Sequence, residues 1–237
     1  MVTGNTASGT FYVFNKKEQS TPIVFVHGVG LTYEIWQPQL DFFKNYSTLS
    51  YDILGHGKSS LTKQNINFDD FSKQLIELID ELEIDKIHLV GFSIGSLIAR
   101  NFATKFNDRL QSLILLGSIY KRSEQQQKIV NERFNQAKKE LKLSKQALKR
   151  WFTDKYLKNN PDTFDKISSI LSSNNMEYFL KTYELFVNHK NDEDFEKIKV
   201  NTLLMTGEYD IGSTIEMSQE LNKVIKNSEL KIVKDGK

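Results

Sequence analysis

Short apolar runs alternate with amphipathic stretches along most of this chain. Runs with the length and apolar content of buried strands occupy residues 11–14, 23–26, 49–53, 87–90, 113–116, 202–205 and 230–233. Between them the spacing predicts helices, most clearly over residues 68–82, where one face would carry Phe71, Leu75, Leu78, Ile79 and Leu82. This alternation is typical of an α/β fold, in which a mostly parallel central sheet has helices on both faces.

The pattern changes between residues 120 and 199, where the strand-like runs stop and the chain becomes helical, charged and aromatic. Two apolar stripes at helical spacing occur there: Val130, Phe134, Ala137 and Leu141, and then Leu148, Trp151, Phe152 and Tyr156. We therefore predict a helical cap over residues 120–199, inserted between two parts of the core at residues 1–119 and 200–237. Such stripes mostly serve packing, but a cap over the carboxyl ends of the strands also has to close a substrate cavity. Trp151 and Phe152 are our candidates for lining it.

In the same part of the chain basic residues outnumber acidic ones around Lys138, Lys139, Lys142, Lys145, Lys149 and Arg150. A solvated helix face is the ordinary explanation for such a run. An anionic substrate is the alternative, and Arg150, beside Trp151, is the first residue to test.

The composition of the chain excludes several classes of catalytic and binding site. The chain has 237 residues, a net charge of +2 and no cysteine. It is long enough for one catalytic domain, and the absence of cysteine excludes disulfides, thiolate nucleophiles and thiolate metal sites. No pair of histidines or acidic cluster has metal-ligand spacing, and the glycine turns lack a dinucleotide or phosphate-loop pattern. We expect neither a cofactor nor a metal, and nothing indicates nucleic-acid binding.

The N-terminal residues 1–6 are polar and lack the basic and apolar regions of a signal peptide. No later run is long enough to cross a bilayer. We expect a soluble cytoplasmic protein whose partner is a small-molecule substrate; the sequence does not predict its oligomeric state.

The most informative motif is Gly91-Phe92-Ser93-Ile94-Gly95, which lies where the apolar run 87–90 meets a helical stretch. This is the pattern of a nucleophile elbow, a turn so tight that its tip residue has strained dihedrals and its flanking positions need small residues. Ser93 is the tip. Its hydroxyl would stand beside the free N–H groups of the following helix, where developing negative charge is stabilised. The motif predicts a serine that attacks carbonyl carbons.

Upstream, the run 23–26 ends at His27-Gly28-Val29-Gly30, followed by Trp36 and by the glycine-rich segment 51–59. With these motifs the chain resembles the α/β-hydrolase superfamily, and most closely its capped single-domain serine hydrolases, such as 3-oxoadipate enol-lactonase-like esterases and lactonases. The resemblance implies that the backbone N–H groups of Val29 and Ile94 form the oxyanion hole. It also implies that Asp210, in the turn after the run 202–205, is the triad acid. Glu208 is a weaker alternative for the acid, while Ser213 and Glu216 fit a helix capping box.

A serine hydroxyl is a poor nucleophile until a histidine removes its proton, and the family order is serine, acid, histidine. No histidine follows Asp210. His27, His56 and His88 are expected to be structural, and His189 is the only conceivable substitute. We therefore expect that the chain stops just before the catalytic histidine and lacks a final helix, through an incomplete gene, a chosen expression boundary or natural truncation. An uncovered apolar sheet surface would then promote self-association.

These observations predict a serine hydrolase that acts on a small ester or lactone through an acyl-enzyme at Ser93. Loss of the base costs about a million-fold in turnover in a measured triad, so this chain should be nearly inactive until a histidine is restored. The alternative is a non-catalytic protein of the same fold that binds a small apolar ligand or a partner.

Overall fold

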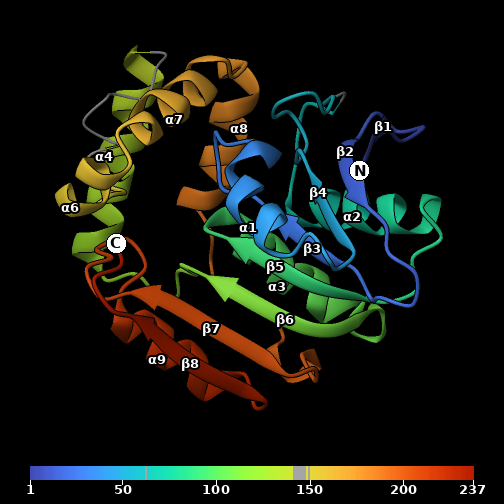
Figure 1. The fold of residues 1–237 in the computed structure, drawn as a ribbon. Helices are drawn as coiled ribbons and strands as arrows, with labels where there is room; N and C mark the ends of the chain where they lie inside the picture. The colour runs from blue at the N-terminus through green and yellow to red at the C-terminus, as the bar shows by residue number, and fades with distance from the viewer. Residues whose placement is uncertain (62, 141–147, 149) are drawn as a thin grey trace.

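The computed structural model describes residues 1–61, 63–140, 148 and 150–237. Within these residues an eight-stranded sheet has the order β1-β2-β4-β3-β5-β6-β7-β8 (Figure 1). The first two strands pair antiparallel with their neighbours, and the strands from β4 to β8 are parallel. The strands are β1 (Val2–Asn5), β2 (Phe11–Asn15), β3 (Ile23–Val26), β4 (Thr48–Tyr51), β5 (Ile87–Phe92), β6 (Leu110–Leu116), β7 (Thr202–Gly207) and β8 (Ser228–Val233). The predicted α/β fold with a mostly parallel sheet is confirmed.

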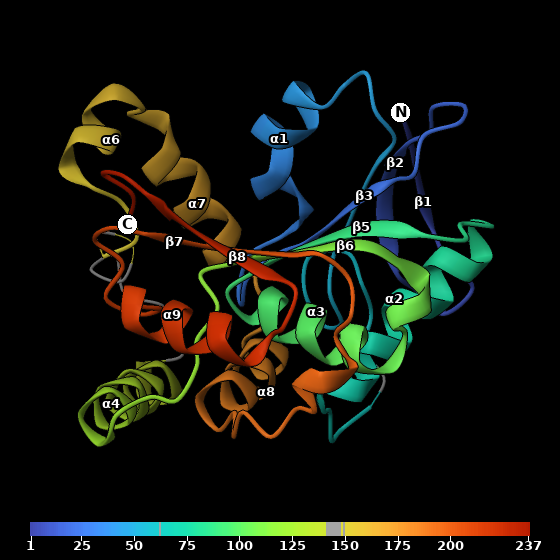
Figure 2. The same ribbon diagram turned by 90° about the horizontal axis from the view of Figure 1, so that it is seen from below.

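Helices cover both faces of the sheet (Figure 2). On one face lie the short 3-10 helix η1 (Tyr33–Trp36) and α1 (Gln37–Phe42), which pack Trp36 and Leu40, respectively, against Phe25 and Val90. On the other face lie α2 (Phe68–Glu81), α3 (Ile94–Lys105) and α9 (Ile215–Val224), with two further 3-10 turns at η2 (Asn107–Arg109) and η3 (Phe195–Lys197). The largest cluster of buried apolar side chains fills this second layer.

Helix α2 forms where its sequence pattern predicts it. The Asn67 side chain accepts a hydrogen bond from the Asp70 N–H, and the Asp70 carboxylate accepts one from the Asn67 N–H, which completes a capping box at its start. Phe71, Leu75 and Leu78 of the predicted apolar face are fully buried.

The chain between β6 and β7 contains α4 (Glu124–Glu140), α6 (Asp154–Asn159), α7 (Asp162–Ser172) and α8 (Met176–Val187), which gather beyond the carboxyl ends of the parallel strands (Figure 1). We call these four helices the inserted helices. Of the first predicted stripe, Val130, Phe134 and Ala137 are buried on α4. Leu141 and the basic residues Lys142, Lys145 and Lys149 lie outside the described residues.

The second predicted stripe is not continuous. Trp151 and Phe152 lie in a turn, and Thr153 then starts α6 by accepting a hydrogen bond from the Tyr156 N–H. Because a new helix starts after Thr153, the residues of the predicted stripe, Leu148, Trp151, Phe152 and Tyr156, do not lie on one helix and do not share one face.

At the far edge of the sheet, β8 leaves Ile232 43% and Val233 41% exposed. Lower solubility or self-association through an uncovered apolar sheet surface stays a prediction. Over the described residues, the helices are too short or too polar for a transmembrane span.

Candidate active site

Ser93 occupies a sharp bend between β5 and α3. Its φ of 56° and ψ of −120° place it in a region that residues other than glycine rarely adopt. The two flanking glycines make this bend possible. A Cβ on Gly91 would lie 2.2 Å from the Gly95 carbonyl oxygen, and a Cβ on Gly95 would lie 2.4 Å from the Val26 carbonyl oxygen. Glycine is therefore required at both positions, and the bend presents the serine at the end of the strand.

Two backbone N–H groups are available near Ser93. Val29 lies in the turn after β3, and no described residue accepts a hydrogen bond from its N–H. Ile94 is the first residue of α3, where an N–H has no intrahelical carbonyl to donate to. The positive end of the helix lies at the same place. These donors have the character that an oxyanion hole needs.

Asp210 lies in the loop between β7 and α9, and its own loop holds it. Its Oδ1 accepts hydrogen bonds from the N–H groups of Gly212 at 2.7 Å and Ser213 at 3.0 Å. Its Oδ2 accepts one from the Ser213 hydroxyl at 2.5 Å. The carboxylate is thus fixed in orientation by three donors.

The predicted capping box of Ser213 and Glu216 is wrong. Thr214 caps α9 by accepting a hydrogen bond from the Met217 N–H, because the helix starts one residue later than that motif requires. The Ser213 hydroxyl instead donates a hydrogen bond to the Asp210 carboxylate, and the Ser213 carbonyl accepts one from the Thr206 hydroxyl at 2.6 Å.

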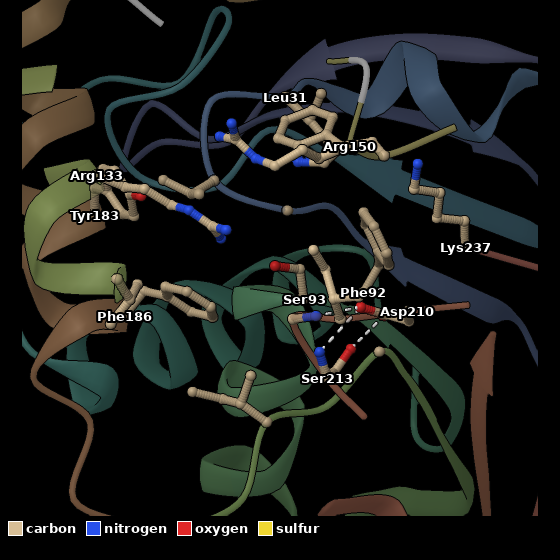
Figure 3. A pocket seen from close by; sticks show the side chains of 18 of the residues that line it. Leu31, Phe92, Ser93, Arg133, Arg150, Tyr183, Phe186, Asp210, Ser213 and Lys237 are labelled. Carbon is tan, nitrogen blue, oxygen red and sulfur yellow. Dashed lines mark hydrogen bonds between the residues drawn. The ribbon is translucent and has the colours of Figure 1, made fainter. Parts of the chain in front are cut away.

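Ser93 and Asp210 line one cavity of about 200 Å³. Figure 3 shows Ser93 near its centre, with Asp210 and Ser213 on one side and with Arg133, Tyr183 and Phe186 on the other. Of the predicted site residues, Val29, Arg150 and Trp151 also line it. The Ile94 side chain is fully buried in the core, and Ile94 is not among the residues that line the cavity.

Phe152, predicted to line the cavity, is not part of its wall. Its ring stacks on Tyr156 with centroids 5.5 Å apart, and its carbonyl accepts a hydrogen bond from Lys237 Nζ at 3.2 Å. The turn before α6 directs the neighbouring Trp151 inward instead.

Several cavity residues on the inserted helices were not predicted from the sequence: Arg133, Phe179, Tyr183 and Phe186. A signal for Arg133 existed, since it follows Val130 by three residues and so shares a helix face with the predicted stripe. Tyr183 had no comparable signal, because aromatic residues on α8 are equally typical of packing.

None of the four histidines lines the cavity. His27 is fully buried, where its Nε2 accepts a hydrogen bond from the Ile53 N–H at 3.0 Å and its Nδ1 donates to the Gly28 carbonyl at 2.8 Å. Burial lowers its pKa to about 4, although the Gly28 bond opposes this. Burial, with a smaller contribution from His27, lowers the pKa of His56 to about 3. Both imidazoles are neutral structural groups under the turns that flank the site.

The remaining histidines are also engaged elsewhere. His88 Nδ1 lies 2.7 Å from the Ser112 hydroxyl within the sheet. His189 Nε2 lies 3.1 Å from Glu193 Oε1, and its ring packs edge-on against Phe68. His189 borders a different cavity from Ser93, so it does not substitute as the base.

Known proteins resemble this chain along most of its length. A family model described as alpha/beta hydrolase fold matches residues 21–237. The (E)-2-((N-methylformamido)methylene)succinate hydrolase of Acinetobacter baylyi is 29% identical, with 90% of this chain and 81% of the relative aligned. The 3-oxoadipate enol-lactonase 2 of the same organism is 24% identical, with 89% of this chain and 79% of the relative aligned.

Solved structures share the fold. The enol-lactonase from Burkholderia xenovorans superposes with a TM-score of 0.82 at 20% identity, over 98% of this chain and 91% of the other. A thermophilic esterase from Thermogutta terrifontis superposes with a TM-score of 0.83 at 22% identity, over 99% of this chain and 88% of the other. The matched family and its hydrolase members support a hydrolytic function. On the family match over residues 21–237, the chain belongs to the α/β-hydrolase fold family.

Proposed function

We propose that this protein hydrolyses a small ester or lactone through an acyl-enzyme at Ser93. The observation that carries the proposal is the strained φ of 56° at Ser93, which presents a hydroxyl in a cavity that Val29 also lines, and no described residue accepts a hydrogen bond from the Val29 N–H. Strain of this kind persists at functional sites because the surrounding fold over-determines it. The enol-lactonase and esterase names among the similar proteins support the same class of substrate.

In the proposed reaction the Ser93 oxygen bonds to the carbonyl carbon, and the N–H groups of Val29 and Ile94 stabilise the oxyanion. The bond from that carbon to the alcohol oxygen then breaks, and the serine proton ends on the departing alcohol. Water next attacks the acyl-enzyme, which releases the acid and restores the serine hydroxyl. Asp210 orients and charge-matches the base that carries these protons.

The base is the missing part, since none of the four histidines lies at the cavity. We therefore infer that turnover by residues 1–237 alone is slow, by about a million-fold relative to a complete triad. Appending a segment that carries a histidine to Lys237 tests this inference, and the extended chain is expected to gain activity by orders of magnitude.

Added imidazole tests this proposal on the chain as it is. We expect p-nitrophenyl acetate hydrolysis to accelerate with imidazole beyond the reaction in buffer, and we expect Ser93→Ala to remove that excess. Ser172→Ala, on the exposed surface of α7, is the matched control and should retain it. A fluorophosphonate probe followed by peptide mass spectrometry should label Ser93. Equal acceleration in Ser93→Ala, or labelling at another residue, would contradict the proposal.

A non-catalytic binding protein is the second candidate, favoured by the same lack of a histidine at the cavity. It predicts that small apolar ligands raise the melting temperature, while neither imidazole nor a histidine-bearing extension produces ester turnover. Rescue that depends on Ser93 excludes this alternative.

A further inference from the structure

The cavity that contains Ser93 has an unusual balance of charge. Arg133 enters it from α4, Arg150 enters it from the turn before α6, and Lys237 also lines it (Figure 3). Asp210 is the one acidic side chain among the described residues that line it. That carboxylate already accepts three hydrogen bonds from its own loop and lies on the other side of Ser93 in this view.

The other three arginines of the chain each have an ion-pair or hydrogen-bond partner for the guanidinium group. Arg100 pairs with Glu193 at 2.6 Å, and Arg109 pairs with Asp80 at 2.7 Å. Arg122 donates hydrogen bonds at 3.1 Å to the carbonyls of Phe186 and Val187. In contrast, neither Arg133 nor Arg150 has an ion pair or hydrogen bond with any described residue. The two guanidinium groups that lack a partner among the described residues are the two that face the cavity.

These two charges influence each other. Burial lowers the pKa of Arg150, and the positive charge of Arg133 lowers it further. Burial raises the pKa of the Tyr183 hydroxyl, while the positive charges of Arg133 and Arg150 oppose that rise. Like charges that converge in a partly desolvated site are unfavourable unless an anion lies between them.

The scaffold around the arginines is well packed. The Tyr183 ring meets Phe134 of α4 edge-on at 5.3 Å and lies 5.6 Å from Phe179. These contacts join α4 to α8 on the side of the cavity where Arg133 lies. The helix that carries Arg133 is therefore packed against the helix that carries Tyr183.

We propose that Arg133 and Arg150, together with the Tyr183 hydroxyl, bind a carboxylate of the substrate. The proposal rests on the proposed function, and it narrows the substrate to a short ester or lactone that carries a free carboxylate group. Guanidinium groups present a planar fork that matches a carboxylate with two hydrogen bonds. Val130, Phe179 and Phe186 give the same cavity of about 200 Å³ an apolar wall for a short carbon chain.

Binding of glutarate, the diacid that hydrolysis of a carboxylated short ester would release, tests the site without requiring turnover. Calorimetry on Ser93→Ala separates this test from the proposed chemistry, because that variant cannot form an acyl-enzyme. We expect one glutarate per chain and much weaker binding of the neutral analogue glutaramide. Arg133→Gln and Arg150→Gln should each lower the glutarate affinity about tenfold or more.

Lys139→Gln is the matched control, since it removes one positive charge from an exposed position of the same helix as Arg133. It should leave glutarate affinity unchanged. Arg133→Lys, which keeps the charge but loses the fork, should give an intermediate affinity and guards against a folding defect in the glutamine variant. Equal binding of glutarate and glutaramide, unchanged affinity in both arginine variants, or tighter binding of methylphosphonate than of glutarate would overturn the proposal.

Discussion

The Ser213 hydroxyl donates a hydrogen bond of 2.5 Å to Asp210 Oδ2. Ser213 is buried, whereas Asp210 is half-buried and faces the cavity. The bond fixes the rotation of the carboxylate before any base or substrate is present. Ser213 is therefore a positioning residue for the proposed triad acid.

Replacing this serine should cost stability. We expect Ser213→Ala to lower the free energy of unfolding by about 1 to 2 kcal/mol, because it removes a hydrogen bond to a charged group. Urea denaturation measures this. Ser172→Ala, on an exposed helix face, should change the same quantity by less than about 0.5 kcal/mol. Equal losses in the two variants would show that the bond contributes little.

The elbow predicts a gain in stability when its strain is removed. Ser93→Gly should raise the free energy of unfolding by about 1 kcal/mol, since glycine adopts a φ of 56° without a Cβ penalty. Ser93→Ala removes the same hydroxyl but keeps the strain, so it should not be stabilised. Thermal and urea unfolding of both variants measure the change in the free energy of unfolding. A similar gain in Ser93→Gly and Ser93→Ala would show that loss of the hydroxyl, and not relief of strain, is the cause.

At Gly95, two residues after Ser93, we expect a substitution to lower the free energy of unfolding. Gly95→Ala would place a Cβ 2.4 Å from the Val26 carbonyl oxygen, so we expect a loss of about 2 to 3 kcal/mol in unfolding free energy. Gly212→Ala is the control, because its Cβ would make only an ordinary contact of 3.4 Å with Asp210. It should be nearly neutral in the same urea titration.

The environment of Glu193 leads us to expect that the free energy of unfolding falls in acid. Burial acts to raise its pKa, but the hydrogen bond from His189 and the charge of Arg100 outweigh burial and lower the pKa to about 2. Because the folded pKa lies below the ordinary 4.5, the stabilisation is complete above pH 4.5 and is lost as the pH falls toward 2. The shift corresponds to about 3 kcal/mol.

Glu193→Gln tests this expectation. At pH 7 the variant should lose about 3 kcal/mol, because Arg100 is then buried without its counter-ion, and its unfolding free energy should vary less between pH 4.5 and 2. Urea titrations across that range measure both effects. Glu184→Gln, at an exposed position of α8, should match the parent chain. A parallel pH profile in Glu193→Gln would assign the acid sensitivity to other groups.

The sheet was predictable because buried parallel strands read as short apolar runs. The run 23–26 coincides with β3, while β1 was missed because Val2–Asn5 is largely exposed and carries no apolar alternation. The position of Ser93 was predictable for a different reason, since few backbones other than an elbow require glycines two residues on either side of a serine.

The cavity wall was less predictable, because periodicity assigns a helix face but not what that face meets. Phe152 was predicted to line the cavity because it belongs to an apolar stripe at helical spacing, but the helix start at Thr153 interrupts that stripe. Arg133 was overlooked because a charged residue beside an apolar stripe normally faces solvent, and only the packing of α4 on α8 turns it inward. Ser213 was assigned to the wrong helix position because the Asp210 turn competes for its hydroxyl.

The division of labour between the sheet and the inserted helices has an evolutionary consequence. Ser93, Val29 and Asp210 follow strand ends, whereas Arg133, Trp151 and Tyr183 belong to the segment between β6 and β7. On the proposed function, mutation in that segment would change which substrates bind, while Ser93 and Asp210 keep their places at the strand ends. Related proteins could then evolve different substrate preferences on one catalytic scaffold, and replacing the segment with that of a homologue would be a way to engineer a new preference.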